Sequence, residues 1–448
     1  MNAYANNMLE DRAQELVEKL YLAAKSSKTR RFHALYDKVF RKDFLRSAWN
    51  TVKRNRGSSG VDGERIADII ESGEDALLEE LQRRLQEGRY RPRRVKRVYI
   101  PKPDGRERPL GIPTVRDRVI QTATKFIMEP IFESDFLDCS YGFRPHRCAH
   151  DALEEIRVTM NKGYHFVLDA DIKGFFDNIN HDKLLGFVSQ RINDRRVVKL
   201  IRQWLKSGVL DGDSIHDTDV GTPQGGVISP LLANIYLHEF DLFWTNQTDV
   251  HGILVRYADD FVILFRSAHE ARKGIELVKQ KLSELDLELN ETKSKLVDTR
   301  SGKRGFDFLG FYHRRVKSPK YKTYYLQKWP GAKSMQSIKS TVKELIGPRW
   351  ILKWNIDEVV SRLNPCLRGW MNYFRFGNSS RKFSQVDMYV HERMALWWSK
   401  KHQKRGRGWT TNYTVSDHIS SGIHRLSGNV EYWEYYRMRK KEGHRKAV

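Results

Sequence analysis

A short acidic break at residues 257–260 (YADD) interrupts a strongly apolar stretch of the chain. It lies between the runs 253–255 (ILV) and 261–265 (FVILF). β-branched and aromatic runs on both sides of a short polar break predict two strands joined by a tight turn. In such a turn the carboxylates of Asp259 and Asp260 would repel each other and would be partly desolvated. A divalent cation such as Mg²⁺ would remove that cost; the alternative is an acidic turn that faces solvent.

The charge of the chain indicates a polyanionic partner. Its 448 residues, enough for about three domains, include 80 Lys and Arg against 56 Asp and Glu, a formal net charge of +24. Nucleic acid is favoured over a membrane, because no apolar stretch approaches the roughly 18 residues of a transmembrane helix and no signal peptide is visible. The three cysteines have no paired spacing, which excludes a zinc ribbon or a disulfide framework and predicts a cytoplasmic protein.

A second acidic segment precedes the hairpin by about 90 residues. Residues 166–172 alternate, so that Asp169 and Asp171 share one face of a predicted strand and apolar residues share the other. In-line phosphoryl transfer by two metal ions needs carboxylates that converge from separate strands. Asp171 and the pair Asp259 and Asp260 could supply them. The sequence therefore suggests a phosphoryl-transfer site in a small α+β unit.

Two further segments could bind the phosphates or the base of a nucleotide. Residues 95–110 predict a basic hairpin with a Pro-Asp-Gly turn, and Lys102 and Arg108 lie near its tip. Residues 221–226 form a Gly-rich loop between the two acidic segments, and glycine lets a backbone approach a ligand closely. Taken alone, the hairpin could equally be a solvated basic surface.

Six sequence blocks occur in an order that resembles group II intron-encoded reverse transcriptases. In chain order they are Ile112-Pro113 with the helix that follows, 140–145 (SYGFRP), 171–177 (DIKGFFD), 223–226 (PQGG), 257–260 (YADD) and 308–311 (FLGF). Six blocks in order are far more specific than any one of them. The resemblance implies an α+β right-hand polymerase, with fingers, a palm built on an antiparallel sheet, an α-helical thumb and a basic C-terminal tail.

The resemblance also implies which groups bind metal. Asp171 and Asp259 would be ligands of two Mg²⁺ ions, with Mn²⁺ as a possible substitute, and Asp260 would be the supporting carboxylate. The backbone carbonyl of Ile172 would complete a metal shell. Asp169 is the competing candidate on the same strand, and a hydrogen-bonded structural carboxylate is the favoured interpretation of it.

The choice of Asp171 over Asp169 rests on the spacing to Phe176. In the family, an aromatic residue at this distance acts as a steric gate that crowds a ribose 2′-OH, the group that distinguishes RNA precursors from DNA precursors. The alternative is that Phe176 packs in the core, since one Phe beside another commonly does.

Other residues take roles in nucleotide binding from the same resemblance. Lys102 and Arg108 would grip the incoming dNTP, and Gln224 would lie beneath the nascent base pair. Lys293 could be the general acid that protonates the leaving pyrophosphate, although an ordinary surface lysine is an equal alternative. Arg144 is either a buried structural residue or a contact to the template strand.

The chain is expected to divide into four parts. These are an N-terminal extension (1–34), fingers and palm (35–312), a thumb or maturase-specific domain (313–400) and a basic C-terminal segment (401–448). The motif 367–374 (LRGWMNYF) resembles the thumb of the family. A basic cluster near its end is expected to bind nucleic acid. The cluster consists of Lys400, Lys401, Lys404, Arg405 and Arg407.

The resemblance implies an RNA-directed DNA polymerase that is also a maturase with a role in retrohoming. Its partners would be a group II intron RNA, an RNA template with a DNA primer, and dNTPs. No C-terminal nuclease is expected, because no paired cysteines and histidines follow Cys366. The alternatives are an intron-free group II-like enzyme, a defence-associated reverse transcriptase, or a DNA-templated repair polymerase.

Overall fold

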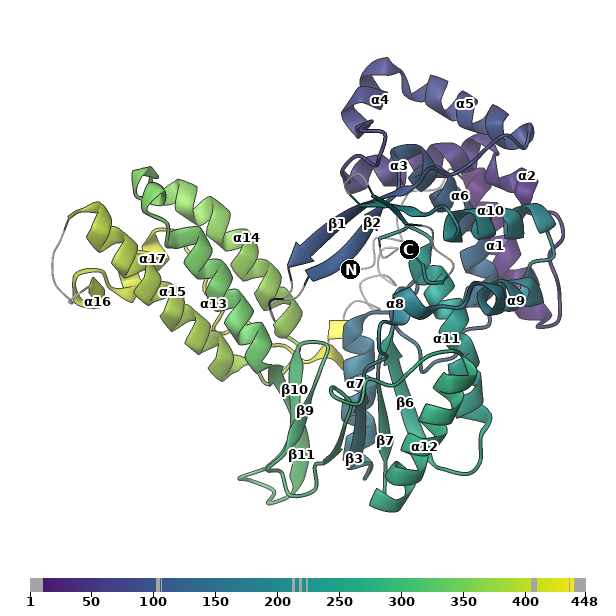
Figure 1. Ribbon diagram of the computed structural model, residues 1–448. Coiled ribbons are helices and arrows are strands. Elements are labelled where there is room, and N and C mark those ends of the chain that lie inside the picture. Colours follow the sequence, from purple (N-terminus) through teal and green to yellow (C-terminus); the bar gives the residue numbers. More distant parts are fainter. Residues whose placement is uncertain are drawn as a thin grey trace. The chain divides into compact units, whose positions relative to one another are not determined.

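The computed structural model describes residues 11–101, 105, 107–211, 214–216, 220–222, 225–403, 409–434 and 436–438 (Figure 1). The described chain is mixed α+β, as predicted. It divides into two compact units. The first consists of residues 1–149, 170–263 and 272–295, and the second of residues 150–169, 264–271 and 296–448. None of the described helices combines the length and the apolar character that a membrane span requires.

The helices of the first half of the chain lie mainly in the first unit. They are α1 (Asp11–Ser26), α2 (Tyr36–Val39), α3 (Lys42–Asn55), α4 (Ile66–Ser72), α5 (Glu74–Gln86), α6 (Val115–Glu133), α7 (Ala149–Asn161), α8 (Phe175–Asn178), α9 (His181–Arg191), α10 (Arg195–Leu205) and α11 (Ser229–Asn246). Helix α6 is buried along almost its whole length, because α1 and α3 both pack against it.

The later helices follow the acidic hairpin. They are α12 (Ala268–Glu284), α13 (Ala332–Ile346), the 3₁₀ helix η1 (Arg349–Lys353), α14 (Ile356–Phe374), α15 (Ser380–Lys401), α16 (Trp409–Asn412) and α17 (Val415–Ser420). Helices α13, α14 and α15 lie side by side in the second unit (Figure 1). Trp370 of the LRGWMNYF motif packs within this group, with its ring centroid 4.7 Å from Phe374 and 5.8 Å from Phe383.

The strands within the described residues form three sheets. They are β1 (Val95–Pro101), β2 (Glu107–Ile112), β3 (Phe166–Ala170), β4 (Val209–Asp211), β5 (Ser214–His216), β6 (Gly252–Tyr257), β7 (Asp260–Phe265), β8 (Lys295–Asp298), β9 (Gly305–Phe308), β10 (Phe311–Lys317) and β11 (Tyr324–Pro330). The strand orders are β2-β1-β4-β5, β6-β7-β3-β8 and β11-β10-β9.

The predicted basic hairpin is the antiparallel pair β1 and β2. Its register places Ile100 opposite Arg108 and Lys96 opposite Ile112. On its other edge β1 pairs with β4 in parallel, with Val95 opposite Val209. The prediction of a hairpin at 95–110 is therefore confirmed.

The acidic strand is shorter than predicted. Strand β3 ends at Ala170, so Asp171 and Ile172 lie beyond it rather than within it. If the strand simply alternated, Val167 would point to the face opposite its apolar neighbours, yet it is fully buried. A strand covered on both faces reads as a continuous apolar run, and β3 lies in the interior of its sheet. The alternating pattern therefore predicted the burial of one face of β3 and missed the burial of the other.

Candidate active site

The two neighbouring carboxylates lie at a tight turn between strands. Strand β6 ends at Tyr257 and β7 begins at Asp260, which confirms the predicted strand, turn and strand. Ala258 adopts a left-handed backbone with φ of 58°, a conformation that costs a residue with a Cβ about 1–2 kcal/mol. All five residues of 261–265 are fully buried. The apolar run thus anchors the turn on a rigid strand.

Burial and mutual repulsion destabilise the charged forms of both carboxyls. Desolvation raises the pKa of Asp259, and the charge of Asp171 raises it further. Desolvation, followed by the charges of Asp259 and Asp171, raises the pKa of Asp260 to about 6, although this side chain keeps an exposed surface. The cation of Arg108 acts in the opposite direction on both carboxyls. The three acidic residues are therefore close enough to act on one another electrostatically.

Asp171 is held by a segment that follows α12. Its carboxylate Oδ2 accepts hydrogen bonds from Lys293 Nζ at 2.7 Å and from Asn290 Nδ2 at 2.9 Å. Its backbone carbonyl accepts from the Asn290 N–H at 2.8 Å, and its own N–H donates to Ser294 Oγ at 3.2 Å. The sequence did not single out Asn290 or Ser294. The only signal was that both lie in a polar stretch directly after an alternating apolar one.

Ile172 pairs with Leu289 in an isolated antiparallel bridge. The hydrogen bonds of this bridge join the flanking residues, from Lys173 N to Glu288 O and from Asn290 N to Asp171 O. In such a non-hydrogen-bonded pair the residue's own C=O points away from the partner strand. The carbonyl of Ile172 is thus directed away from Leu289, which leaves it available for the role that the sequence predicted.

Asp169 is placed differently from Asp171. It lies inside β3 and is only partly exposed, whereas the charge that raises the pKa of both turn carboxyls is that of Asp171. These observations favour Asp171. Within the described residues, however, no three His, Cys, Asp or Glu side chains meet closely enough to form a ready-made metal site.

The two phenylalanines of the 171–177 block differ in burial. Phe175 is 2% exposed, whereas Phe176 in α8 is only partly buried. Their rings meet edge to face at 5.2 Å, and the Phe176 carbonyl accepts the Thr222 N–H at 2.7 Å. Phe175 therefore belongs to the core, whereas Phe176 is not fully enclosed by it.

The Gly-rich loop contacts the basic hairpin. Gly225 has φ of 112°, and a Cβ at this position would lie 2.7 Å from the carbonyl oxygen of Gly111 in β2. A side chain here would meet both backbone strain and a clash. Arg108 is exposed at the end of the same hairpin. Lys102 and Gln224, the other two predicted nucleotide contacts of these segments, lie outside the described residues.

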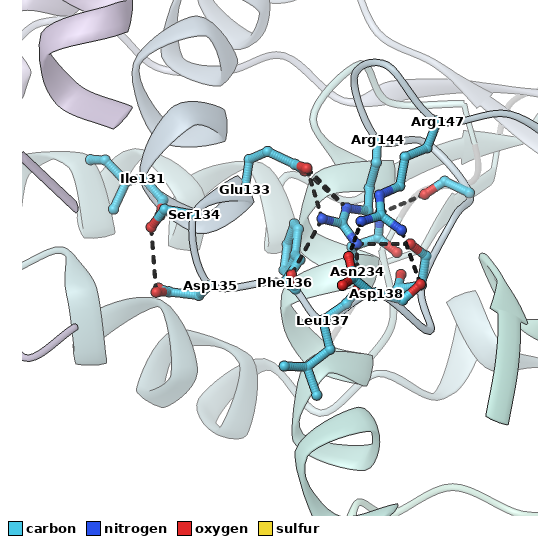
Figure 2. Close-up of polar contacts among 12 residues, drawn as sticks. Ile131, Glu133, Ser134, Asp135, Phe136, Leu137, Asp138, Arg144, Arg147 and Asn234 are labelled. Atoms are coloured by element: carbon cyan, nitrogen blue, oxygen red, sulfur yellow. Dashed lines mark hydrogen bonds and ion pairs between the residues drawn. The ribbon is translucent and has the colours of Figure 1, made fainter. Parts of the chain in front are cut away.

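Arg144 is a structural residue. Figure 2 shows its guanidinium facing Glu133, to which Nη2 donates at 2.7 Å, and the group also donates to the carbonyls of Leu137 at 2.6 Å and Ser140 at 2.7 Å. The residue is 4% exposed. Of the two interpretations left open by the sequence, the structural one is supported, because the guanidinium is occupied in ordering residues 133–144.

The basic cluster is described only in part, since Lys404, Arg405 and Arg407 lie outside the described residues. Lys400 is exposed and, with Arg349 and Arg393, lines a pocket of about 400 Å³. Lys401 instead donates to the carbonyls of Leu352 and Trp354. The two neighbouring lysines are thus in different situations: Lys400 is presented to solvent, and Lys401 is tied to the end of η1.

Two family models match the chain. The family described as "Reverse transcriptase (RNA-dependent DNA polymerase)" matches residues 100–313. The family described as "Group II intron, maturase-specific domain" matches residues 335–414. The two matches are consecutive and do not overlap, and the first contains all three acidic residues of the site.

Three curated relatives are similar to the chain over different shares of its length. The chain is 32% identical over 345 residues to Protein YkfC of Escherichia coli, which covers 68% of this chain and 88% of that protein. It is 41% identical over 215 residues to the group II intron-encoded protein LtrA of Lactococcus lactis subsp. cremoris, which covers 47% of this chain but only 35% of LtrA. An uncharacterized 91 kDa protein in the cob intron of Schizosaccharomyces pombe is 28% identical over 85% of this chain and 56% of that protein.

Proposed function

Because the chain belongs to the group II intron reverse transcriptase and maturase family, we propose that it copies RNA into DNA and assists the splicing of an intron RNA. The observation that carries the polymerase part is the placement of Asp171 directly after β3 and of Asp259 and Asp260 at the β6–β7 turn, where the charge of Asp171 acts on both turn carboxyls. A site that raises the pKa of its own carboxyls gains most from a bound cation, since the cation offsets both the desolvation and the repulsion.

The donor set suits Mg²⁺, with Mn²⁺ as a substitute. Carboxylate and carbonyl oxygens are the ligands that these hard cations prefer, and Asp171, Asp259, Asp260 and the carbonyl of Ile172 offer only such atoms. When bound, two such ions would supply the Lewis acid that activates the attacking hydroxyl and stabilises charge on the transferred phosphate. The role of the chain is to hold the carboxylates on two rigid segments, the β6–β7 turn and the end of β3.

The remaining site residues would act on the dNTP and the primer. Arg108 would bind the triphosphate through its forked guanidinium, together with Lys102, and Gln224 would support the nascent base pair. The ring of Phe176 would exclude a 2′-OH. Lys293 would donate a proton to the leaving pyrophosphate, which requires that its ammonium leave or share its bond to Asp171.

We assign the architecture of a right-hand polymerase to these parts. Residues 35–312 would be the fingers and palm after an extension at 1–34, 313–400 the thumb or maturase-specific domain, and 401–448 a basic segment. The helical group α13, α14 and α15 supports the thumb assignment. Retrohoming would combine both activities on one intron RNA.

The maturase part is supported by the basic surface of the second unit. Arg349, Arg393 and Lys400 line one pocket together with Trp397, and no acidic residue lines it among the described residues. Trp397 is only 2% exposed, so the three cations would bind RNA phosphates rather than a stacked base. The expected partners are a group II intron RNA and the RNA template with its DNA primer.

The decisive experiment is the double substitution Asp259→Ala and Asp260→Ala. Primer extension on an RNA template should fall to background, while binding and splicing of the intron RNA should persist. Asp182→Ala is a matched control, because this carboxylate in the same unit is 88% exposed, and it should leave extension unchanged.

Other outcomes separate the alternatives. Extension that survives the double substitution would remove these carboxylates from the polymerase proposal. Loss of splicing in a variant that is folded and binds RNA would show that the two activities do not separate. Extension without any splicing by the wild-type chain would favour an intron-free or defence-associated enzyme, and a preference for DNA templates would favour a repair polymerase.

A further inference from the structure

Arg256 is a fully buried cation directly before the acidic turn. Its Nε and Nη2 both donate to the carboxylate of Asp241, with the Nε–Oδ1 distance at 2.7 Å, and both side chains have no exposed surface. Nη1 donates to Asn234 Oδ1 at 3.1 Å and to the carbonyl of Ala258 at 2.8 Å, and Nη2 also donates to Ser140 Oγ at 2.8 Å. Since a guanidinium has five N–H donors, all of them are used.

One of these five bonds reaches the turn itself. Ala258 is the residue before Asp259 and has the left-handed φ of 58°. A non-glycine residue persists in this conformation only where its surroundings fix it. The Arg256 guanidinium holds the Ala258 carbonyl through one N–H group. Three side chains hold the guanidinium through its other N–H groups. Arg256 therefore restrains the backbone of the residue directly before Asp259.

Residues 139–142 also pack against the turn. This segment pairs with β6, because the Arg256 N–H donates to the Cys139 carbonyl at 2.8 Å and the Tyr141 N–H donates to the Arg256 carbonyl at 2.9 Å. Asn234 Nδ2 donates to the Gly142 carbonyl at 2.8 Å. A Cβ on Gly142 would lie 2.4 Å from the Ala258 nitrogen, so only glycine allows this approach.

The buried pair is not explained by stability alone. Replacing a buried ion pair with apolar side chains of similar volume is often neutral or stabilising, so burial and charge do not by themselves require an arginine. The hydrogen bond to the Ala258 carbonyl, however, requires a side chain that can donate to Ala258 and to Asp241 at the same time. A planar fork can bond several acceptors in different directions at once, and a lysine ammonium cannot.

We propose that Arg256 is a positioning residue of the polymerase site, which holds the 257–260 turn so that Asp259 faces the metal ions. Asp241, Asn234 and Ser140 act through it by fixing the guanidinium. This inference rests on the proposed polymerase function, and it adds a residue that does not touch substrate or metal.

The test is the double variant R256M/D241L in the full chain. It removes the ion pair without leaving either charge unpaired. We expect a folded protein whose kcat for nucleotide incorporation falls about tenfold or more and whose Mg²⁺ concentration for half-maximal rate rises several-fold. The KM for primer–template should not change, because the nucleic-acid contacts are untouched. If this variant does not fold, R256K replaces it, since lysine keeps the charge beside Asp241 but cannot also hold Ala258.

The control is R191M/D135L. Arg191 and Asp135 form another largely buried ion pair in the same unit, 7% and 13% exposed, and their side-chain N–O distance is 3.2 Å. This double variant should change the urea midpoint but not kcat or the Mg²⁺ requirement. A folded Arg256 variant with wild-type kcat and wild-type Mg²⁺ requirement would overturn the proposal.

A separate readout distinguishes this inference from the polymerase proposal. If the wild-type chain incorporates no nucleotide, the polymerase proposal fails, and the positioning role is then tested by the thermal shift on adding Mg²⁺ alone. Wild-type protein and R191M/D135L should be stabilised by the ion, and the Arg256 variant should respond only at several-fold higher Mg²⁺. An equal response of all three would overturn the inference.

Discussion

Asp260→Asn should stabilise the metal-free protein, and the gain should depend on pH. The carboxyl of Asp260 has a pKa of about 6 in the folded chain, against an ordinary value of 3.8, because it is desolvated and lies beside Asp259 and Asp171. An elevated pKa in the folded state means that the ionised form is penalised by folding. The penalty is absent below about pH 3.8, grows between 3.8 and 6, and is complete above that. Asparagine cannot ionise, so it escapes the penalty.

The expected gain is about 1 kcal/mol at pH 8. At about 1.4 kcal/mol for each pH unit between the two pKa values, a fully buried carboxyl would give about 3 kcal/mol. Asp260 retains an exposed surface, so solvent screening reduces this figure to about 1 kcal/mol. From the same linkage, about half of the gain should remain at pH 5.

Urea unfolding in EDTA at pH 5 and pH 8 measures both values. Asp138→Asn is the control, since this side chain is 97% exposed and should show no comparable rise with pH. Adding Mg²⁺ at about ten times its dissociation constant should stabilise the wild type by about 1.4 kcal/mol and Asp260→Asn by less. A loss of stability at pH 8 in EDTA, or a gain that is larger at pH 5 than at pH 8, would refute the reasoning.

Three further variants test other residues of the proposed sites. Lys293→Met removes the cation bonded to Asp171, and if it is the general acid, the single-turnover incorporation rate should fall about 100-fold or more. Phe176→Ala should lower the preference for dNTP over rNTP, measured as a ratio of kcat/KM, by about 10- to 200-fold. K400Q with R393Q should weaken RNA binding and lower the slope of log K against log salt by about 1 for each phosphate that these cations neutralise in the wild type.

Two of these predictions have a matched control variant, and the first has an outcome that would contradict it. An unchanged incorporation rate in Lys293→Met would show that Lys293 is not the general acid. Its ion pair would then be the only role that the structure supports. Phe176→Tyr keeps the ring and should keep the sugar discrimination, so equal discrimination in Phe176→Ala would assign the ring to packing. Lys25→Gln changes an exposed lysine of the first unit; a salt slope that falls as much in this variant as in K400Q with R393Q would argue against the pocket.

The sequence was most informative where structure depends on near neighbours. The hairpin at 95–110 and the strands around 257–260 were predicted from local apolar runs and turn residues, and both are present. The segment 166–172 was only partly right, because β3 ends at Ala170. Where a strand ends depends on the partner that pairs with it, and the pairing of Ile172 with Leu289 spans more than 100 residues.

The contacts that organise the site were not predictable in the same way. Lys293 was only a candidate proton donor, and nothing in the sequence indicated that it and Asn290 would bond to Asp171. Arg256 was one charged residue in an apolar strand, and nothing local indicated that Asp241 would neutralise it inside the core. Which residues form such pairs depends on the segments that the fold brings together, and hydrophobic periodicity does not predict those segments.

The residues alone identify which carboxylates are present, that two of them lie between two apolar strands, and that the motifs follow the order of a family. Residue types and local apolar runs are read directly from the chain, so these conclusions need no tertiary contact. The folded structure adds how these groups act on one another, from the elevated pKa of Asp260 to the guanidinium that bonds to the turn. Desolvation and charge coupling depend on distance in space, which is set when distant segments pack together.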